Sequence, residues 1–297
     1  MIFRRIPFRR DALPDFLIIG AQKAGTTSLA SYLAAHPGVA PSKCKEVHFF
    51  DLNYEKGVDW YRSHFSIAAG QGLRSRLRGR RMQTGEASPY YIFHPLAASR
   101  AFDLLPATRV IVLLRDPVDR AYSHYHHEIR LGAEALSFED AIEAEDQRIA
   151  EEEQRLALDS SYISFNYQHF TYLKRGIYAD QIRRWLRYYR PEQFLILSSE
   201  RFFQDPALEY QRVLHFLGLP PWDLPAYPAE LVGTYRPLPT ATRKYLQEYF
   251  APHNSALQRL LNSVWPGTGD VVLDGFSRSA GKERFLAEAG EDKISAR

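Results

Sequence analysis

The 297-residue sequence predicts an α/β fold in which a central parallel sheet is flanked by helices, in three layers. Two observations predict this fold. Apolar runs at residues 16–19, 110–114 and 194–197 have the length and composition of strands that are buried on both faces. The runs alternate with segments whose apolar residues have helical spacing, which is typical of a parallel sheet with helical crossovers.

The first of these units, residues 15–36, predicts a phosphate-binding loop and therefore a P-loop-like fold. A buried strand leads into a loop bounded by Gly20 and Gly25, and a helix with apolar residues Leu29 and Leu33 follows. Backbone N–H groups at the start of such a helix point at a bound anion, and the helix dipole favours negative charge there. The residues predicted to bind the phosphate are Gly20, Gln22, Lys23, Ala24, Gly25, Thr26, Thr27 and Ser28.

The loop differs from a standard P-loop, which carries lysine directly after its second glycine. Here Thr26 follows Gly25, and the lysine is Lys23, inside the loop, from where it would reach a bridging or leaving oxygen. This order, G-x-x-K-x-G-T-[ST], resembles the 5′-phosphosulfate-binding loop of the sulfotransferases that use 3′-phosphoadenosine 5′-phosphosulfate (PAPS). A plain strand–helix connection with an incidental lysine is the alternative interpretation.

Composition limits the other function classes. A net charge of +3 argues against bulk nucleic-acid binding, and a single cysteine, Cys44, excludes an intrachain disulfide and fits a reducing compartment. No apolar run approaches the roughly 20 residues of a membrane span, and the arginine-bearing N-terminus lacks the apolar stretch of a secretory signal. We expect a flexible basic arm at residues 1–14, one domain at 15–265 and a tail at 266–297. These features favour a bacterial cytoplasmic enzyme over a Golgi enzyme.

The segment at residues 41–51 predicts a second chemical centre. Strand alternation would place Glu46 and His48 on one face with Phe50, and Val47 and Phe49 on the other. Desolvation beside an apolar layer would then raise the pKa of the Glu46 carboxyl towards useful base strength. A half-buried segment in which a Glu–Lys pair is satisfied is the alternative.

The motif K-E-x-H-F-F-D in this segment resembles that of glycosaminoglycan sulfotransferases of the heparan sulfate N- and 3-O-sulfotransferase type. The resemblance implies that Glu46 is the catalytic base and that Lys23 is the loop lysine. It also implies that His48 assists the catalytic step and that Asp51 occupies an accompanying position of the motif. The similarity extends over roughly residues 15–265, with its strongest motifs in the family's order.

The second apolar strand ends in Arg115, and Asp116 and Pro117 predict the start of a helix there. An arginine at the carboxyl end of a strand can clamp a phosphate in bidentate fashion. The sequence R-D-P-x-x-R-x-x-S resembles the family's 3′-phosphate motif, which implies that Arg115 and Ser123 bind that group.

Three weaker resemblances add candidates. The segment at residues 85–91 resembles G-E-K-[ST]-P-x-Y, with Ala87 where relatives carry lysine and with Glu86 and Ser88 as polar candidates. Residues 175–178 resemble the family's G-x-Y segment, which implies that Tyr178 binds the nucleotide. Arg236 falls where the family has a basic loop that closes over the 3′-phosphate.

Other segments carry structural expectations. We expect a solvated acidic helix over residues 134–153 and a helix over 240–261 that is interrupted at 252–254. We expect an exposed arginine-rich loop at 74–81 and an aromatic stretch at 162–172 that lines an acceptor cleft or packs in the core. We expect His124, His126 and His127 to lie on a surface helix and to bind no metal.

These observations predict transfer of a sulfuryl group from PAPS to a hydroxyl or amine, with the diphosphate PAP as product and no metal. The resemblance implies a glycan or glycolipid acceptor, while a lipid or small metabolite stays open. A P-loop kinase for a small molecule is one alternative, although Asp116 is its only candidate magnesium ligand. A non-catalytic module that binds a nucleotide or polyanion is the other alternative.

Overall fold

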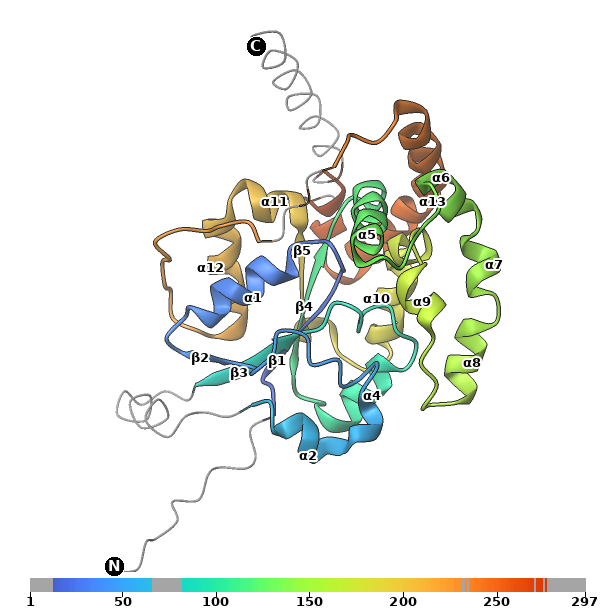
Figure 1. Ribbon diagram of the computed structural model, residues 1–297. Helices are drawn as coiled ribbons and strands as arrows, with labels where there is room; N and C mark the ends of the chain where they lie inside the picture. The colour runs from blue at the N-terminus through green and yellow to red at the C-terminus, as the bar shows by residue number, and fades with distance from the viewer. Residues whose placement is uncertain are drawn as a thin grey trace, which may run out of the picture.

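The computed structural model describes residues 13–65, 82–230, 233, 235–269, 271–274 and 276. Five parallel strands form one sheet in the order β2-β3-β1-β4-β5, and helices cover both of its faces (Figure 1). The predicted three-layer α/β fold is therefore confirmed. The strands are β1 (Phe16–Gly20), β2 (Val39–Pro41), β3 (Gln83–Ala87), β4 (Arg109–Leu114) and β5 (Phe194–Ser198).

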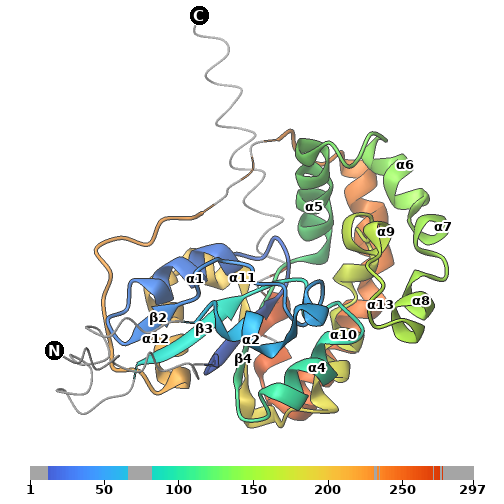
Figure 2. The same cartoon turned by 60° about the horizontal axis from the view of Figure 1, so that its bottom comes forward.

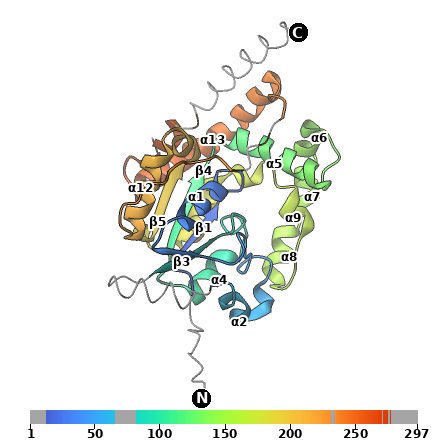
Figure 3. The same ribbon diagram turned by 60° about the vertical axis from the view of Figure 1, so that its left-hand side comes forward.

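The two central strands, β1 and β4, form the middle of the core. Their apolar side chains are buried because helices shield both faces of the sheet, which explains why the sequence shows unbroken apolar runs. Phe16 pairs with Arg109 and Ile18 with Ile111 in parallel register, and Figure 3 shows β3, β1, β4 and β5 following one another across the sheet. Both strands therefore end at the same edge, where ligands bind in open α/β sheets.

All of the described α-helices except α2 fall into three groups. Helices α1, α11 and α12 pack on one face of the sheet, and α4, α10 and α13 lie on the other (Figure 1). Helices α5 to α9 stand to one side of the sheet, on the right in Figure 2. The bounds are α1 (Thr26–Ala34), α2 (Gly57–Arg62), α4 (Ala97–Leu104), α5 (Pro117–Leu131), α6 (Phe138–Glu143), α7 (Glu145–Ile149), α8 (Glu152–Leu158), α9 (Phe165–His169), α10 (Tyr178–Leu186), α11 (Ser199–Gln204), α12 (Pro206–Leu217) and α13 (Thr240–Val264), with 3-10 turns η1 (Tyr54–Lys56), η2 (Lys174–Gly176) and η3 (Pro191–Gln193).

Strands β2 and β3 were not among the strands that the sequence predicts. Strand β3 has the sequence QTGEA, which lacks an apolar run, yet it pairs with β1 and is mostly buried. A Cβ atom on Gly85 would lie 2.3 Å from the ring of Phe16, so glycine allows the two strands to pack closely.

The expected solvated helix over residues 134–153 is wrong. The chain forms α6 and α7 and begins α8 there, and three of the acidic side chains, Glu134, Glu145 and Glu152, are buried. Glu134 accepts hydrogen bonds from Arg148 and the Tyr172 hydroxyl, and Glu145 accepts them from backbone N–H groups at the start of η2. These carboxylates hold neighbouring segments together, a long-range role that composition does not reveal.

The expected interruption of the C-terminal helix is also wrong, because α13 runs through Pro252 without a break. Proline in a helix interior costs about 3 kcal/mol. Buried side chains on both sides of it, Leu246 and Phe250 before and Leu257 and Leu261 after, offset that cost by packing against the body of the protein.

Other expectations concern the ends of the chain and one loop. The loop at 74–81, residues 1–12 of the predicted arm and the chain beyond residue 276 lie outside the described residues. Within the predicted tail, Val272 and Phe276 are buried in the main core. In the part of the chain that the structure describes, no helix is both long and apolar enough to cross a membrane.

Candidate active site

The predicted phosphate loop connects β1 to α1 at the carboxyl edge of the sheet. Gly25 has φ +94°, a conformation that glycine adopts without strain, and a Cβ atom there would lie 2.8 Å from the Phe203 ring. A Cβ atom on Gly20 would lie 2.4 Å from the Ile92 side chain. Within the described residues, no side chain caps α1, so its first N–H groups are available to an anion.

Arg115 joins the end of β4 to this loop. Its Nη1 donates a hydrogen bond of 2.9 Å to the backbone carbonyl of Lys23, and the Tyr178 hydroxyl donates one of 2.8 Å to the carbonyl of Arg115. The predicted cap is confirmed, since the Asp116 carboxylate accepts from two N–H groups at the start of α5. Ser123 lies buried further along that helix. The structure therefore brings Lys23, Arg115 and Tyr178 together.

Positive charge accumulates around Lys23. Burial is the main reason that the pKa of its amine falls to about 8. The neighbouring charges of Arg130, Arg115 and Lys45 lower this pKa further. Three other cations are thus close enough to act on the Lys23 amine, while the charge of Glu128 partly opposes them, so this region favours a bound anion.

The Glu46–His48 segment lies at the same edge but is not the expected strand. It forms a turn, with Phe49 and Phe50 both buried and with His48 at φ +53°. The turn nevertheless brings the expected carboxylate and imidazole together. His48 Nε2 lies 3.0 Å from Glu46 Oε2, and its Nδ1 lies 2.8 Å from Asp51 Oδ2.

The pKa values in this turn differ from the expectation. Burial acts to raise the pKa of the Glu46 carboxyl, but the hydrogen bond from His48 and the charge of Lys45 outweigh it and lower the pKa to about 2. Burial acts to lower the pKa of His48, but its two carboxylate partners raise it to about 10. At neutral pH the turn therefore holds an imidazolium between two carboxylates, and the expected raised pKa of Glu46 is wrong.

Lys45 also pairs with Glu46, at 2.8 Å between Nζ and Oε1. The satisfied Glu–Lys pair that was the alternative interpretation is thus present beside the His48 contact. Both side chains of the Lys45–Glu46 pair are about one-third exposed, so an acceptor can reach the carboxylate.

Arg175 is a residue that the sequence reasoning did not single out. Its guanidinium is almost fully buried, donates to the side-chain oxygen of Gln22 in the loop, and lies 4.5 Å from the centre of the Tyr90 ring. It also donates to the carbonyls of Tyr167 and Gln168. Because these contacts come from distant segments, no local pattern around Arg175 predicts them.

Helix α5 carries the histidines beside the loop, and one expectation about them is wrong. His124 is fully buried, 3.1 Å from Glu128, which also accepts a 2.8 Å hydrogen bond from His169. The packing of α5 against η2 and α13 buries this face, so α5 is not a surface helix at that point. Among the described residues, no group of three His, Cys, Asp or Glu side chains is placed to hold a metal ion.

Glu230 and Arg236 contact the start of α1 and helix α5. The N–H of Glu230 donates to Ser28 Oγ at 2.9 Å, and the Tyr122 hydroxyl on α5 donates to the carbonyl of Arg236 at 3.0 Å. The Arg236 side chain is exposed. The Arg236 backbone is therefore attached to the helix that carries Ser123, and no contact of the Arg236 guanidinium with the loop is seen in the described residues.

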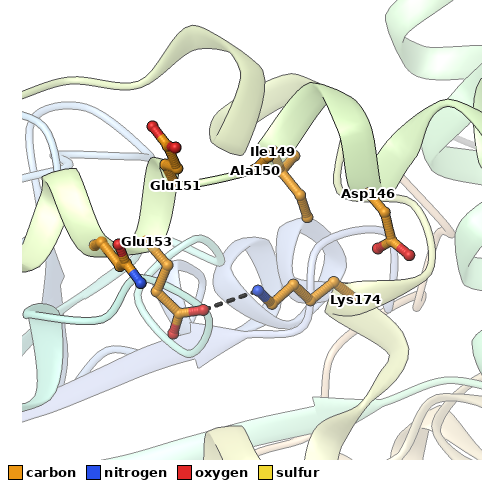
Figure 4. Close-up of a pocket in the computed structure, with 7 residues that line it drawn as sticks. Asp146, Ile149, Ala150, Glu151, Glu153 and Lys174 are labelled. Atoms are coloured by element: carbon orange, nitrogen blue, oxygen red, sulfur yellow. Dashed lines mark hydrogen bonds and ion pairs between the residues drawn. The ribbon is translucent and has the colours of Figure 1, made fainter.

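A separate hollow of about 350 Å³ lies between α7, α8 and η2 (Figure 4). Its lining holds none of the predicted site residues, and its Lys174 is paired with Glu153 at 2.8 Å. The chemistry described above is therefore not located in this hollow.

The protein-family model described as the sulfotransferase domain matches residues 13–226 of this sequence. Together with the fold and the loop, this match shows that the chain belongs to the sulfotransferase family and is a transferase of that class.

Particular relatives sharpen this assignment. The chain is 31% identical over 286 residues to the human bifunctional heparan sulfate N-deacetylase/N-sulfotransferase 3, covering 86% of this chain and 30% of that protein. It is 25% identical to the membrane-associated sulfotransferase kil1 of Dictyostelium discoideum, covering 84% of this chain and 65% of that one. A sulfotransferase structure from Alicyclobacillus acidocaldarius is 31% identical, with a TM-score of 0.62, over 85% of this chain and 97% of that one. The chain thus spans about 30% of the length of the human relative.

Proposed function

We propose that this enzyme transfers a sulfuryl group from PAPS to a hydroxyl or amine of a glycan or glycolipid. The observation that carries the proposal is the gathering of Lys23, Arg115 and the Glu46–His48 pair at one edge of the sheet. PAPS brings several negative charges close together, which matches the excess of positive charge around Lys23.

The donor would be held at two places. The backbone N–H groups of residues 25–27 and the hydroxyls of Thr26, Thr27 and Ser28 would hold the 5′-phosphate, supported by the uncapped start of α1. The N–H of Ala24 donates to the carbonyl of Ala21 at 3.2 Å and would have to leave it to join them. Arg115 and Ser123 would hold the 3′-phosphate, with Tyr178 beside Arg115 and Arg236 approaching from the segment over α5.

PAPS supplies an activated sulfuryl group attached to a phosphate that is a good leaving group. Glu46 would take the proton of the acceptor as the acceptor atom bonds to sulfur and the bond from sulfur to the phosphate oxygen breaks. Lys23 would donate to that leaving oxygen, where negative charge develops. His48 would orient the Glu46 carboxylate and place positive charge beside the sulfuryl oxygens.

A low pKa of Glu46 is compatible with this role. The carboxylate is ionised throughout the physiological pH range, so it is ready to accept a hydrogen bond. The acceptor O–H or N–H becomes strongly acidic only as the acceptor atom bonds to sulfur, and a weak base then suffices to take the proton.

The acceptor and the location are argued by analogy. Relatives named for heparan sulfate support a glycan acceptor. The single cysteine supports the bacterial cytoplasm as the site of action, whereas the Dictyostelium relative is named as membrane-associated.

Two other functions were open from the sequence. A kinase needs a magnesium ligand near the loop, but the Asp116 carboxylate already accepts two backbone N–H groups. A non-catalytic binding module is disfavoured by the proximity of Glu46, His48 and Asp51, since binding alone does not need that arrangement.

The test is Glu46→Gln, which keeps the size of the side chain but removes the base. We expect turnover of PAPS with N-desulfated heparan sulfate to fall about 1000-fold, while the affinity for PAP stays within about threefold. Equal losses of turnover and PAP affinity would remove Glu46 from the role of base.

A further inference from the structure

The carboxylate of Glu86, at the end of β3, is the centre of a buried hydrogen-bond network. Three hydroxyls donate to it: Tyr61 at 2.6 Å, Ser88 at 2.8 Å and Tyr91 at 3.0 Å. All four side chains are buried. Burial raises the pKa of Glu86 to about 7, although the three hydroxyls act to lower it. A buried carboxylate with three donors is costly to assemble and needs a reason.

Two of these hydroxyls also hold the turn that carries Glu46 and His48. The backbone N–H of His48 donates to Ser88 Oγ at 3.1 Å, and that of Phe49 donates to the Tyr91 hydroxyl at 2.7 Å. The Tyr61 hydroxyl differs from these two, because it donates to Glu86 and no hydrogen bond from it to the turn is seen in the described residues. The Tyr61 ring does stack on Phe49, with ring centres 4.4 Å apart, and a change to phenylalanine keeps that contact.

The carboxylate oxygens of Glu86 determine in which direction the hydroxyls of Ser88 and Tyr91 donate. A hydroxyl has one hydrogen to donate and two lone pairs that accept. Since the hydrogens of Ser88 and Tyr91 point at the carboxylate, their lone pairs face the N–H groups of the turn. A neutral donor in place of Glu86 would compete for the same lone pairs.

The backbone of the turn needs such support. His48 has φ +53°, a conformation that is strained for a residue with a Cβ atom. This conformation places the His48 ring between the carboxylates of Glu46 and Asp51. On the other side, Arg100 Nη1 donates to the carbonyls of Phe50 and Asp51 at 3.1 and 3.3 Å.

We propose that Glu86 is a positioning residue, which acts through Ser88 and Tyr91 to fix the backbone of His48 and so to hold its ring against Glu46. Its importance for catalysis rests on the proposed function, because that function places Glu46 and His48 at the reacting atoms. The geometry that it fixes can be measured without any acceptor.

The first test compares two tyrosines that both donate to Glu86. Tyr91→Phe removes a bond to the turn, whereas Tyr61→Phe is the matched control that removes a hydroxyl from the same carboxylate alone. The readout is the ¹⁵N NMR titration of the His48 imidazole in the full chain, assigned with His48→Asn. Tyr91→Phe and Ser88→Ala should lower the pH at which His48 loses its proton by about one unit or more, and Tyr61→Phe by a few tenths at most.

Glu86→Gln should behave as Tyr91→Phe does. The amide nitrogen of the glutamine would donate to a hydroxyl oxygen that, in the wild-type protein, accepts from a backbone N–H group of the turn. The proposal is overturned if His48 titrates at the same pH in Glu86→Gln and Tyr91→Phe as in the wild-type protein. It is equally overturned if Tyr61→Phe shifts His48 as far as Tyr91→Phe, since the network would then have only a general structural role.

A second arm measures turnover with PAPS and N-desulfated heparan sulfate beside PAP affinity. Tyr91→Phe and Glu86→Gln should lower kcat on the order of 100-fold and leave the Kd for PAP unchanged. Glu46→Gln, measured in parallel, separates the two ideas. If Glu46→Gln keeps full turnover, the proposed chemistry fails, while the His48 titration still decides whether Glu86 positions the ring.

Discussion

The phosphate loop and the Glu46–His48 turn lie at the same edge of the sheet, but different parts of the chain hold them in place. Residues 20–25 take much of their shape from their own glycines and from the strand and helix on either side, and distant Arg115 and Arg175 add hydrogen bonds to Lys23 and Gln22. The turn takes its shape from side chains far away in sequence, since Ser88, Tyr91 and Arg100 are 40, 42 and 50 residues from the backbone groups that they contact. A locally specified element can be read from a motif, whereas the turn needs the folded protein.

This difference predicts a division of labour. Changes at the loop and at Arg115 should weaken donor binding, because those groups face the phosphates. Changes in the turn should lower turnover and leave donor binding intact. The predictions that follow would break or sharpen this division, in order of decreasing effect.

Arg115→Ala should produce a large loss on the donor side. We expect the affinity for PAP to fall on the order of 100-fold, because a charged fork to the 3′-phosphate is lost. AMP, which lacks that phosphate, is the control and should lose only a few-fold. Calorimetry with both nucleotides measures the effect, and equal losses would remove Arg115 from the 3′-phosphate site.

Asp51→Asn should produce the corresponding loss on the turn side. The amide nitrogen facing His48 Nδ1 would force that atom to accept a hydrogen bond, so His48 would become neutral at a lower pH. Turnover should fall about 10- to 100-fold, with PAP affinity unchanged. If PAP affinity fell as far as turnover, the division between loop and turn would not hold.

The pH dependence of kcat/KM should report Lys23. In the free enzyme its pKa is about 8, so raising the pH through that value removes the positive charge that the donor phosphates need. We therefore expect kcat/KM to decline above about pH 8. The decline in kcat should come at higher pH, since a bound donor raises the pKa of Lys23. A kcat/KM that rises steadily up to pH 9.5 would contradict this assignment.

Arg175→Lys should have the smallest effect. Lysine keeps the charge but cannot donate at once to Gln22 and to the carbonyls of Tyr167 and Gln168. A loosened loop should weaken PAP binding about fivefold to tenfold. Arg183→Lys, at an exposed position of α10, is the control, and we expect no change in PAP affinity there. An unchanged affinity in Arg175→Lys would show that the loop does not depend on Gln22 being held.

The sequence predicted those parts of the molecule whose cause is local. The apolar runs identified β1, β4 and β5, and Asp116 with Pro117 identified the start of α5. The loop followed from the spacing of its glycines. The roles assigned to the site residues stay predictions.

The errors have a common physical origin in long-range packing. Alternating polar and apolar residues at 46–50 fit a strand, but His48 is held in a left-handed conformation by a network centred on β3. Helix α13 continues through Pro252 because both of its halves are buried. The burial of His124 and the contact of Arg175 with Gln22 likewise depend on segments that meet only in the fold.

The most direct test of the central claim is calorimetric binding of PAP and of ATP with magnesium to the purified chain. If the loop, Arg115 and Ser123 form a PAPS site, PAP binds tightly without any metal and ATP binds at least about 100-fold more weakly. Tight binding of ATP that requires magnesium, with little binding of PAP, would contradict the account and would mean that Lys23 serves a kinase loop.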